Sequence, residues 1–258
     1  MAKKVNNQPT EMDLALTRSE AFVEKHKKGL IIGLIALAVI VAAGFGVSKW
    51  LTNREDKAQT QLSMGINLMQ QGEGAMQQAM MNDTVNDMQK VAEDFFKKAL
   101  NGDGQYQGLL KIASSYSFTD AANLAKAYAG ECYAKLGQTK EAIQMLESFS
   151  FKSDMVASPA LKATLANCYA TDNQLDKAVA CFKEAADMAD NAQISPAFLI
   201  EAANLLMAQK QNEEALKIYE QIKSDYPSSP MCTTQVSPQD ENVVVQAEIE
   251  KYIEAAKK

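Results

Sequence analysis

Residues Ala125–Phe149 read AKAYAGECYAKLGQTKEAIQMLESF, and the chain repeats this pattern twice more. The second copy is LKATLANCYATDNQLDKAVACFKEA at Leu161–Ala185, and the third is FLIEAANLLMAQKQNEEALKIYEQI at Phe198–Ile222. Successive copies start 36 and then 37 residues apart. Self-similarity at a nearly fixed period is typical of solenoids, in which each repeat packs mainly on its neighbours. We therefore expect each copy to form a pair of antiparallel helices.

Each copy places small and large residues at the same offsets. The first helix has a small residue followed three positions later by a bulky one, as in Gly130 and Tyr133. The second helix has an alanine followed four positions later by a bulky residue, as in Ala142 and Leu146. A small residue facing a large one lets two helices pack closely without voids. The equivalent residues of the other copies are Ala166, Tyr169, Ala178 and Phe182, and Ala203, Leu206, Ala215 and Tyr219.

This register resembles the tetratricopeptide repeat family and implies an all-α fold, a tetratricopeptide-type α-solenoid. Gly137 is expected to end its helix in the left-handed conformation that glycine adopts readily. The 16 residues from Gly72 are expected to be an insertion within an incomplete first repeat. The expected parts are complete repeats near 123–156, 159–191 and 196–228, the incomplete repeat near 57–104, a linking helix at Leu109–Ser115 and a C-terminal capping helix at 241–258.

A different pattern precedes the repeats. The stretch GLIIGLIALAVIVAAGFGV, Gly29–Val47, contains no charged residue. A helix of this length roughly matches a hydrocarbon core about 30 Å thick. A cleaved signal peptide fits less well, because its apolar core is usually about 7–15 residues long and follows a short tail. The sequence therefore predicts a single N-terminal transmembrane helix, a signal anchor at 29–47, between a cytoplasmic tail at 1–28 and a repeat domain at 48–258.

The charges on either side of the apolar stretch predict its orientation. Residues 1–28 contain six Lys or Arg and four Asp or Glu, whereas the rest of the chain contains 20 basic and 28 acidic residues. Basic flanks stay in the cytoplasm, so the tail should be inside and the repeat domain outside. Gly29 and Gly33 form a G-x-x-x-G pair that could pack against another membrane helix. They could equally be ordinary small residues of a membrane helix.

The segment Asn123–Gly137, together with Tyr106–Tyr116 before it, is similar to the ancillary SecYEG translocon subunit family. The resemblance implies a bacterial inner-membrane protein with one membrane span, a cytoplasmic N-terminus and a periplasmic repeat domain. It also implies a chaperone-like or translocon-associated adaptor in protein export. Its partners would be the SecYEG translocon or exported client proteins. The alternative is a structural scaffold subunit of an envelope assembly for cell division or cell-wall synthesis.

The inward positions of the first helices are the expected protein-binding groove. A clamp for a peptide carboxylate would need Lys or Arg there, and these positions hold none. Asn167 and Asn204 occupy equivalent positions and could donate and accept hydrogen bonds along an extended peptide. They could also be ordinary solvated helix residues. The expected groove residues are Ala127, Glu131, Ala163, Asn167, Ile200 and Asn204.

Composition argues against several other functions. The 258-residue chain has one histidine, His26, so triad catalysis and histidine-rich metal sites have little support. A net charge of −6 offers no overall basic footprint for nucleic acid. No C-x-x-C, P-loop or EF-hand motif occurs, so we expect no cofactor, metal or small-molecule substrate and no enzymatic activity. Among Cys132, Cys168, Cys181 and Cys232, a bridge between the middle two and buried free thiols both remain open.

Overall fold

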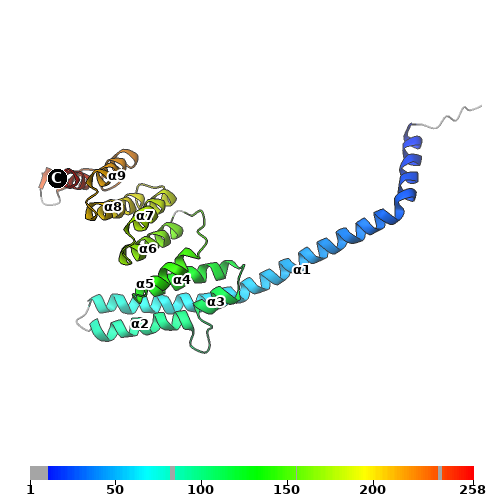
Figure 1. Ribbon diagram of the computed structural model, residues 1–258, viewed down its shortest axis with the longest axis horizontal. Coiled ribbons are helices and arrows are strands. Elements are labelled where there is room, and N and C mark those ends of the chain that lie inside the picture. The colour runs from blue at the N-terminus through cyan, green and yellow to red at the C-terminus, as the bar shows by residue number, and fades with distance from the viewer. Residues whose placement is uncertain (1–10, 82–84, 155, 238–239) are drawn as a thin grey trace, which may run out of the picture. The chain divides into compact units, whose positions relative to one another are not determined.

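The computed structural model describes residues 11–81, 85–154, 156–237 and 240–258 (Figure 1). The chain divides into two compact units, Met1–Arg54 and Glu55–Lys258. The long helix α1, Glu11–Met81, forms the described part of the first unit and continues into the second.

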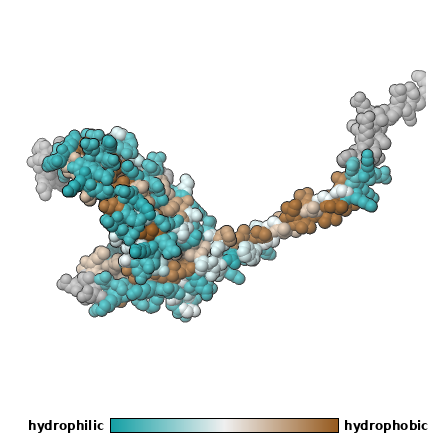
Figure 2. Space-filling view, in the orientation of Figure 1, coloured by the Kyte–Doolittle hydropathy of each residue, from teal (hydrophilic) through white to brown (hydrophobic). Residues whose placement is uncertain are grey.

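The first unit contains the apolar stretch as continuous helix. Among the described residues, α1 is the one helix long and apolar enough to cross a membrane, and its most apolar window is not buried by protein. Figure 2 shows this stretch as a hydrophobic band. A Cβ added to Gly29 or Gly33 would meet nothing within 4 Å, so these glycines pack on no other part of the chain that the structure describes. The Arg54 guanidinium lies 4.7 Å from the ring centre of Trp50.

The second unit is a stack of helices. Consecutive helices pack as pairs, α4 on α5, α6 on α7 and α8 on α9, and these pairs are the three complete repeats. The tetratricopeptide-type α-solenoid is thereby confirmed. Besides α1, the helices of this unit are α2 (Val85–Asn101), α3 (Leu109–Ser115), α4 (Asp120–Lys135), α5 (Thr139–Glu147), α6 (Ala157–Thr171), α7 (Leu175–Ala189), α8 (Ser195–Ala208), α9 (Asn212–Asp225) and α10 (Glu248–Ala256).

The small and large residues pack as their spacing predicts. A Cβ added to Gly130 would lie 2.6 Å from Leu146 Cγ, which is too close for any residue but glycine without a shift of Leu146. Ala178 is fully buried, and so are its equivalents Ala142 and Ala215. The half-buried Tyr133 packs against both hydrophobic clusters of the unit, one built by α1–α4 and the other by α5–α10.

The turn between the two helices of each repeat has one recurring backbone conformation. Gly137, Asn173 and Lys210 have φ angles of 70°, 58° and 61°. The next residue, a glutamine in every repeat, donates its backbone N–H to the carbonyl five residues earlier, as Gln138 does to Tyr133 at 2.9 Å. This bond is one half of a Schellman motif. Glycine adopts the conformation freely, whereas Lys210 holds it at a cost of about 1 kcal/mol.

The incomplete first repeat is a helix pair, and the described part of the expected insertion is helical. Helix α1 runs to Met81 and α2 begins at Val85, so most of the expected insertion extends these two helices. A Cβ on Gly72 would lie 2.7 Å from Phe96 Cε1, so the two helices touch there. The Ala, Met, Gln and Glu residues of this stretch favour helix strongly, and they outweigh its two glycines.

The C-terminal cap differs from the expected helix at 241–258. Two short antiparallel strands, β1 (Gln235–Ser237) and β2 (Asp240–Val245), precede α10. The run Val243–Val245 explains the strand, because β-branched residues favour extended backbone. Helix α10 still covers α9: Ile249 and Ile253 are buried, and the Tyr219 and Tyr252 rings lie 5.4 Å apart.

Candidate protein-binding surfaces

Three polar residues mark the same position on the first helix of each complete repeat. Glu131 on α4 is half-buried, whereas Asn167 on α6 and Asn204 on α8 are exposed. We call these three residues the polar row. Because each lies one position after the small packing residue of its repeat, the solenoid repeats this surface along its length.

The apolar positions expected in the groove are part of the core instead. Ala127, Ala163 and Ile200 are only 2%, 8% and 5% exposed. They lie four residues before the polar row on the same helices, and Ala163 and Ile200 belong to the hydrophobic cluster of α5–α10. A ligand therefore has little access to them, and the expected groove narrows to the polar row.

The two asparagines differ in their hydrogen bonds. The Tyr219 hydroxyl donates to Asn204 Oδ1 at 3.0 Å, so α9 already holds this side chain in place. The Asn204 amide nitrogen remains a donor for a ligand. The Asn167 side chain makes no hydrogen bond within the described part of the chain, so its donor and acceptor both face solvent.

Glu131 is the residue of the polar row whose pKa is shifted by its surroundings. Burial and, to a smaller extent, the negative charge of Glu73 raise the pKa of its carboxyl group, Lys135 partly opposes both, and the resulting pKa is about 7. The same α4 segment buries Cys132, and burial raises the pKa of that thiol to about 12. Near neutral pH, Glu131 therefore exchanges between a neutral hydrogen-bond donor and a carboxylate that only accepts.

Replacing Glu131 with glutamine is expected to remove a pH dependence of stability. The raised pKa means that the folded state binds the Glu131 proton more tightly than the unfolded state does. Stability from this group is thus fully present below pH about 4.5 and is lost as pH rises through about 7. After allowance for partial exposure, E131Q should be more stable than the native protein by about 1–2 kcal/mol at pH 8 and similar to it at pH 4.5.

Melting of both proteins by circular dichroism across this pH range checks the prediction. Glu201→Gln, at an exposed position of α8, is the matched control, and it should leave the stability unchanged at both pH values. If E131Q and the native protein showed the same dependence of stability on pH, the raised pKa assigned to Glu131 would be wrong.

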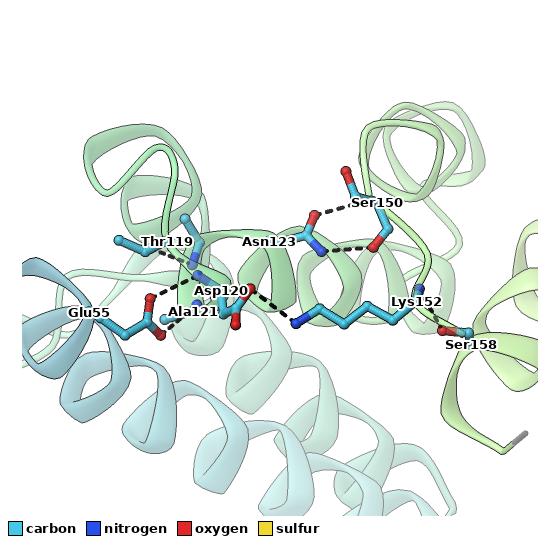
Figure 3. A network of polar contacts seen from close by, with 9 residues as sticks. Glu55, Thr119, Asp120, Ala121, Asn123, Ser150, Lys152 and Ser158 are labelled. Atoms are coloured by element: carbon cyan, nitrogen blue, oxygen red, sulfur yellow. Dashed lines mark hydrogen bonds and ion pairs between the residues drawn. The ribbon is translucent and has the colours of Figure 1, made fainter. Parts of the chain in front are cut away.

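A second surface, which sequence reasoning missed, lies where α4 begins. A hollow of about 430 Å³ there is bordered by the α3–α4 turn, the first turns of α4 and the segment after α5. The Glu55 carboxylate of α1 accepts hydrogen bonds from the backbone N–H groups of Asp120 at 2.8 Å and Ala121 at 3.0 Å (Figure 3). Thr119 Oγ accepts from the Ala122 N–H at 3.0 Å. The free amides that open α4 are thus satisfied inside the protein.

Polar contacts also tie the segment after α5 to α4. Asn123 Nδ2 donates to the Ser150 carbonyl at 2.9 Å, and the Ser150 N–H donates to Asn123 Oδ1 at 2.8 Å (Figure 3). Lys152 Nζ pairs with Asp120 at 3.0 Å, and Lys126 Nζ donates to the Ser148 carbonyl at 3.1 Å. Of this network, only the cap could have been found from the sequence, because Thr followed by Asp is a typical helix start.

The cysteines and acidic residues offer no further chemistry in the described part of the chain. All four cysteines are free thiols, so Cys168 and Cys181 form no bridge. Burial raises the pKa of both thiols, which keeps them in the less reactive neutral form. Within the described residues, no group of three or more His, Cys, Asp or Glu side chains is placed to hold a metal ion.

The paired helices and the recurring turns define a helical-repeat protein of the tetratricopeptide type. The profile of the "Suppressor of spindle checkpoint defect 1 C-terminal domain" family matches residues 132–231, which run from the end of α4 past α9. This match spans about two fifths of the chain and lies within the repeats. No curated protein matches the sequence significantly.

Solved structures of similar fold come from Podosopora anserina. A variant of a protein described as a kinesin light chain with nearly identical TPR-like repeats aligns at a TM-score of 0.50 and 16% identity, covering 74% of this chain and 85% of that one. Another structure of that protein aligns at 0.49 and 16%, covering 75% and 96%. At this identity the first of these shows the repeat fold alone.

Proposed function

We propose that this protein is a membrane-anchored adaptor that binds other proteins through its repeats and has no enzymatic activity. The observation that carries the proposal is the polar row, in which Asn167 and Asn204 are exposed at equivalent positions of successive repeats. Extended stacks of repeats use such recurring positions to contact a chain at several points. A tetratricopeptide-type fold supports protein partners as a class.

The finer proposal places the protein in protein export at the bacterial inner membrane. The apolar part of α1 would be the single span, with the tail in the cytoplasm and the repeat domain in the periplasm. The partners would then be the SecYEG translocon or its exported clients, as the resemblance of Asn123–Gly137 implies. Nucleic acid is not among the proposed partners, because the chain has a net charge of −6.

A fixed scaffold in an envelope assembly is the second candidate function. The matched family profile, whose name refers to the spindle checkpoint, gives no support to protein export in particular, so the scaffold is kept as the alternative to transient client binding. The two functions differ in the number of partners: an adaptor for clients contacts many chains, and a scaffold contacts one at fixed stoichiometry.

Crosslinking from the polar row tests the proposed function. A photoreactive residue at Asn167 or Asn204 of the full-length protein in cells should capture protein partners, and one at Lys183, exposed on the second helix α7, should not. Replacing Asn167 and Asn204 together with Asp should weaken capture severalfold, because it removes two donors and adds negative charge to an acidic domain.

The matched control replaces two exposed amides of the second helices, Gln144→Glu and Gln221→Glu, with the same change in charge. Capture should survive in this control. Equal capture by both double variants would exclude the polar row as the binding surface. Many captured chains would favour the export adaptor, and a single stoichiometric chain would favour the scaffold.

A further inference from the structure

One aromatic side chain of the repeat domain is almost wholly exposed to solvent. Phe118, in the turn between α3 and α4, is 95% exposed, more than any other large hydrophobic residue in the described part of the chain. Its φ angle of 71° is left-handed, a conformation that costs a residue with a Cβ about 1–2 kcal/mol. The exposed ring and the left-handed backbone of Phe118 both cost free energy in the isolated protein. A binding partner that covers the ring would offset part of this cost.

The turn that carries Phe118 is held firmly. The Thr119 hydroxyl donates to the Tyr116 carbonyl at 2.7 Å, and the Thr119 N–H donates to the same carbonyl at 3.2 Å. Immediately after it, the Glu55 carboxylate holds the N–H groups of Asp120 and Ala121 (Figure 3). Phe118 is therefore presented on a rigid turn and is not part of a loose loop.

The surroundings of Phe118 combine apolar side chains, two lysines and the exposed carboxylate of Asp120. We call them the α3–α4 surface, which consists of Ala113, Phe118, Ala122, Lys126, Phe151 and Lys152 around the 430 Å³ hollow. The Lys152 side chain is 57% exposed although it pairs with Asp120, so its ammonium group can still reach a second anion. An aromatic ring beside lysines is the chemistry of a surface that meets lipid headgroups, where rings lie at the interface and cations face phosphates.

The length of chain between the apolar stretch and this surface favours a bilayer over other occupants. Glu55, which binds the α3–α4 turn directly, follows Val47, the last residue of the apolar stretch, by only eight positions. Fully extended, eight residues span at most about 28 Å, and as a helix they span about 12 Å. The polar headgroup layer on each side of a bilayer is itself about 5–8 Å thick. Whatever the orientation of the two units, this short connection keeps the α3–α4 turn near the membrane surface if the apolar stretch is inserted.

We propose that the α3–α4 surface docks on the lipid headgroups of the bilayer that holds the anchor, with the Phe118 ring in the interfacial layer. The proposal rests on the proposed membrane anchoring. Docking at this second point would restrict the freedom of the repeat domain. A tethered domain with two membrane contacts samples fewer orientations than a domain held by a single helix. The polar row would therefore stay at a more constant distance from the membrane.

Tryptophan fluorescence in vesicles tests this proposal. The chain has one tryptophan, Trp50, three residues after the apolar stretch, and it reports on insertion of the anchor. The double variant Trp50→Phe, Phe118→Trp carries the probe on the α3–α4 surface. A matched control, Trp50→Phe, Met80→Trp, carries it at another exposed apolar position of the repeat domain, 25 residues and about 38 Å along α1 from Glu55.

The full-length proteins are reconstituted into vesicles of phosphatidylcholine and phosphatidylglycerol, with and without brominated acyl chains. Bromine quenches only tryptophans that reach the lipid. We expect the Trp50 and Phe118→Trp probes to be blue-shifted and to lose most of their emission in brominated vesicles, and the Met80→Trp probe to keep its emission. Matching circular dichroism melting curves for the three proteins confirm that each is folded.

Each other outcome overturns the proposal in a recognisable way. If Trp50 is quenched and the Phe118→Trp probe is not, the anchor stands and the docking surface is wrong. If neither is quenched, the anchoring itself fails and docking fails with it. If the Phe118→Trp probe is blue-shifted only at high protein density and bromine does not quench it, the surface binds protein and not lipid.

Discussion

The Ala178→Arg variant is expected to lose most of the stability of the repeat domain. Ala178 is fully buried where α7 meets α6, and it belongs to the cluster that unites α5–α10. An arginine there would overpack a contact built for a methyl group and would bury a charge. The expected loss is on the order of 3 kcal/mol or more, a large part of the total stability of a typical domain. Thermal and denaturant unfolding of the full-length protein in detergent, followed by circular dichroism, measures it.

Ala180→Arg provides a matched control two residues along the same helix. Ala180 is exposed, so the same substitution there should change stability by no more than about 0.5 kcal/mol. If Ala178→Arg melted like Ala180→Arg, the assignment of Ala178 to the packed face of its repeat would be wrong. The pair separates the effect of burial from any general effect of added positive charge on an acidic protein.

Packing residues were the part of this structure most open to prediction from sequence. Gly130–Leu146 is a contact between a residue with no side chain and a large one, and such contacts leave a strong periodic signal. The linking helix expected at Leu109–Ser115 is present with the same bounds. Fold class therefore follows from small residues at fixed offsets.

The accessible positions were harder to predict, because neighbouring helices decide which face of a helix is covered. Ala127, Ala163 and Ile200 lie on the first helices, as expected of groove residues, but all three are buried. Periodicity alone cannot say how far a neighbouring helix extends over such a face. The three residues that remain accessible, the polar row, carry side chains that the core could not accommodate without a partner.

The α3–α4 surface was missed because its contacts join residues far apart in sequence. Glu55 caps a helix that begins 65 residues later, and Asn123 holds a segment 27 residues away. Neither distance belongs to a repeat period, so no pattern indicates it. The sequence also does not indicate that Phe118 is exposed, because a lone phenylalanine before Thr119 is an ordinary candidate for the core. Only the left-handed backbone and the exposed ring distinguish it.

External protease is expected to digest the repeat domain of the full-length protein in intact spheroplasts and to leave the tail untouched. The physical reason is the charge asymmetry around the apolar stretch, since six basic residues in 1–28 hold the tail in the cytoplasm. Tags at the two ends, detected after protease treatment, report the fate of each end. The effect should be all or none, because a single span places the two ends on opposite sides of the membrane.

Deletion of Gly29–Val47 provides the control for this topology. The deletion removes the proposed export signal, so the repeat domain should stay in the cytoplasm and resist protease until the spheroplasts are lysed. Lysis also shows that the folded repeat domain can be cleaved under these conditions. If the full-length repeat domain were protected as well, the periplasmic assignment would be excluded, and a repeat protein facing the cytosol would take its place. The lipid contact proposed for Phe118 would then have to lie on the cytoplasmic leaflet, where Lys126 and Lys152 would meet a surface richer in anionic lipid.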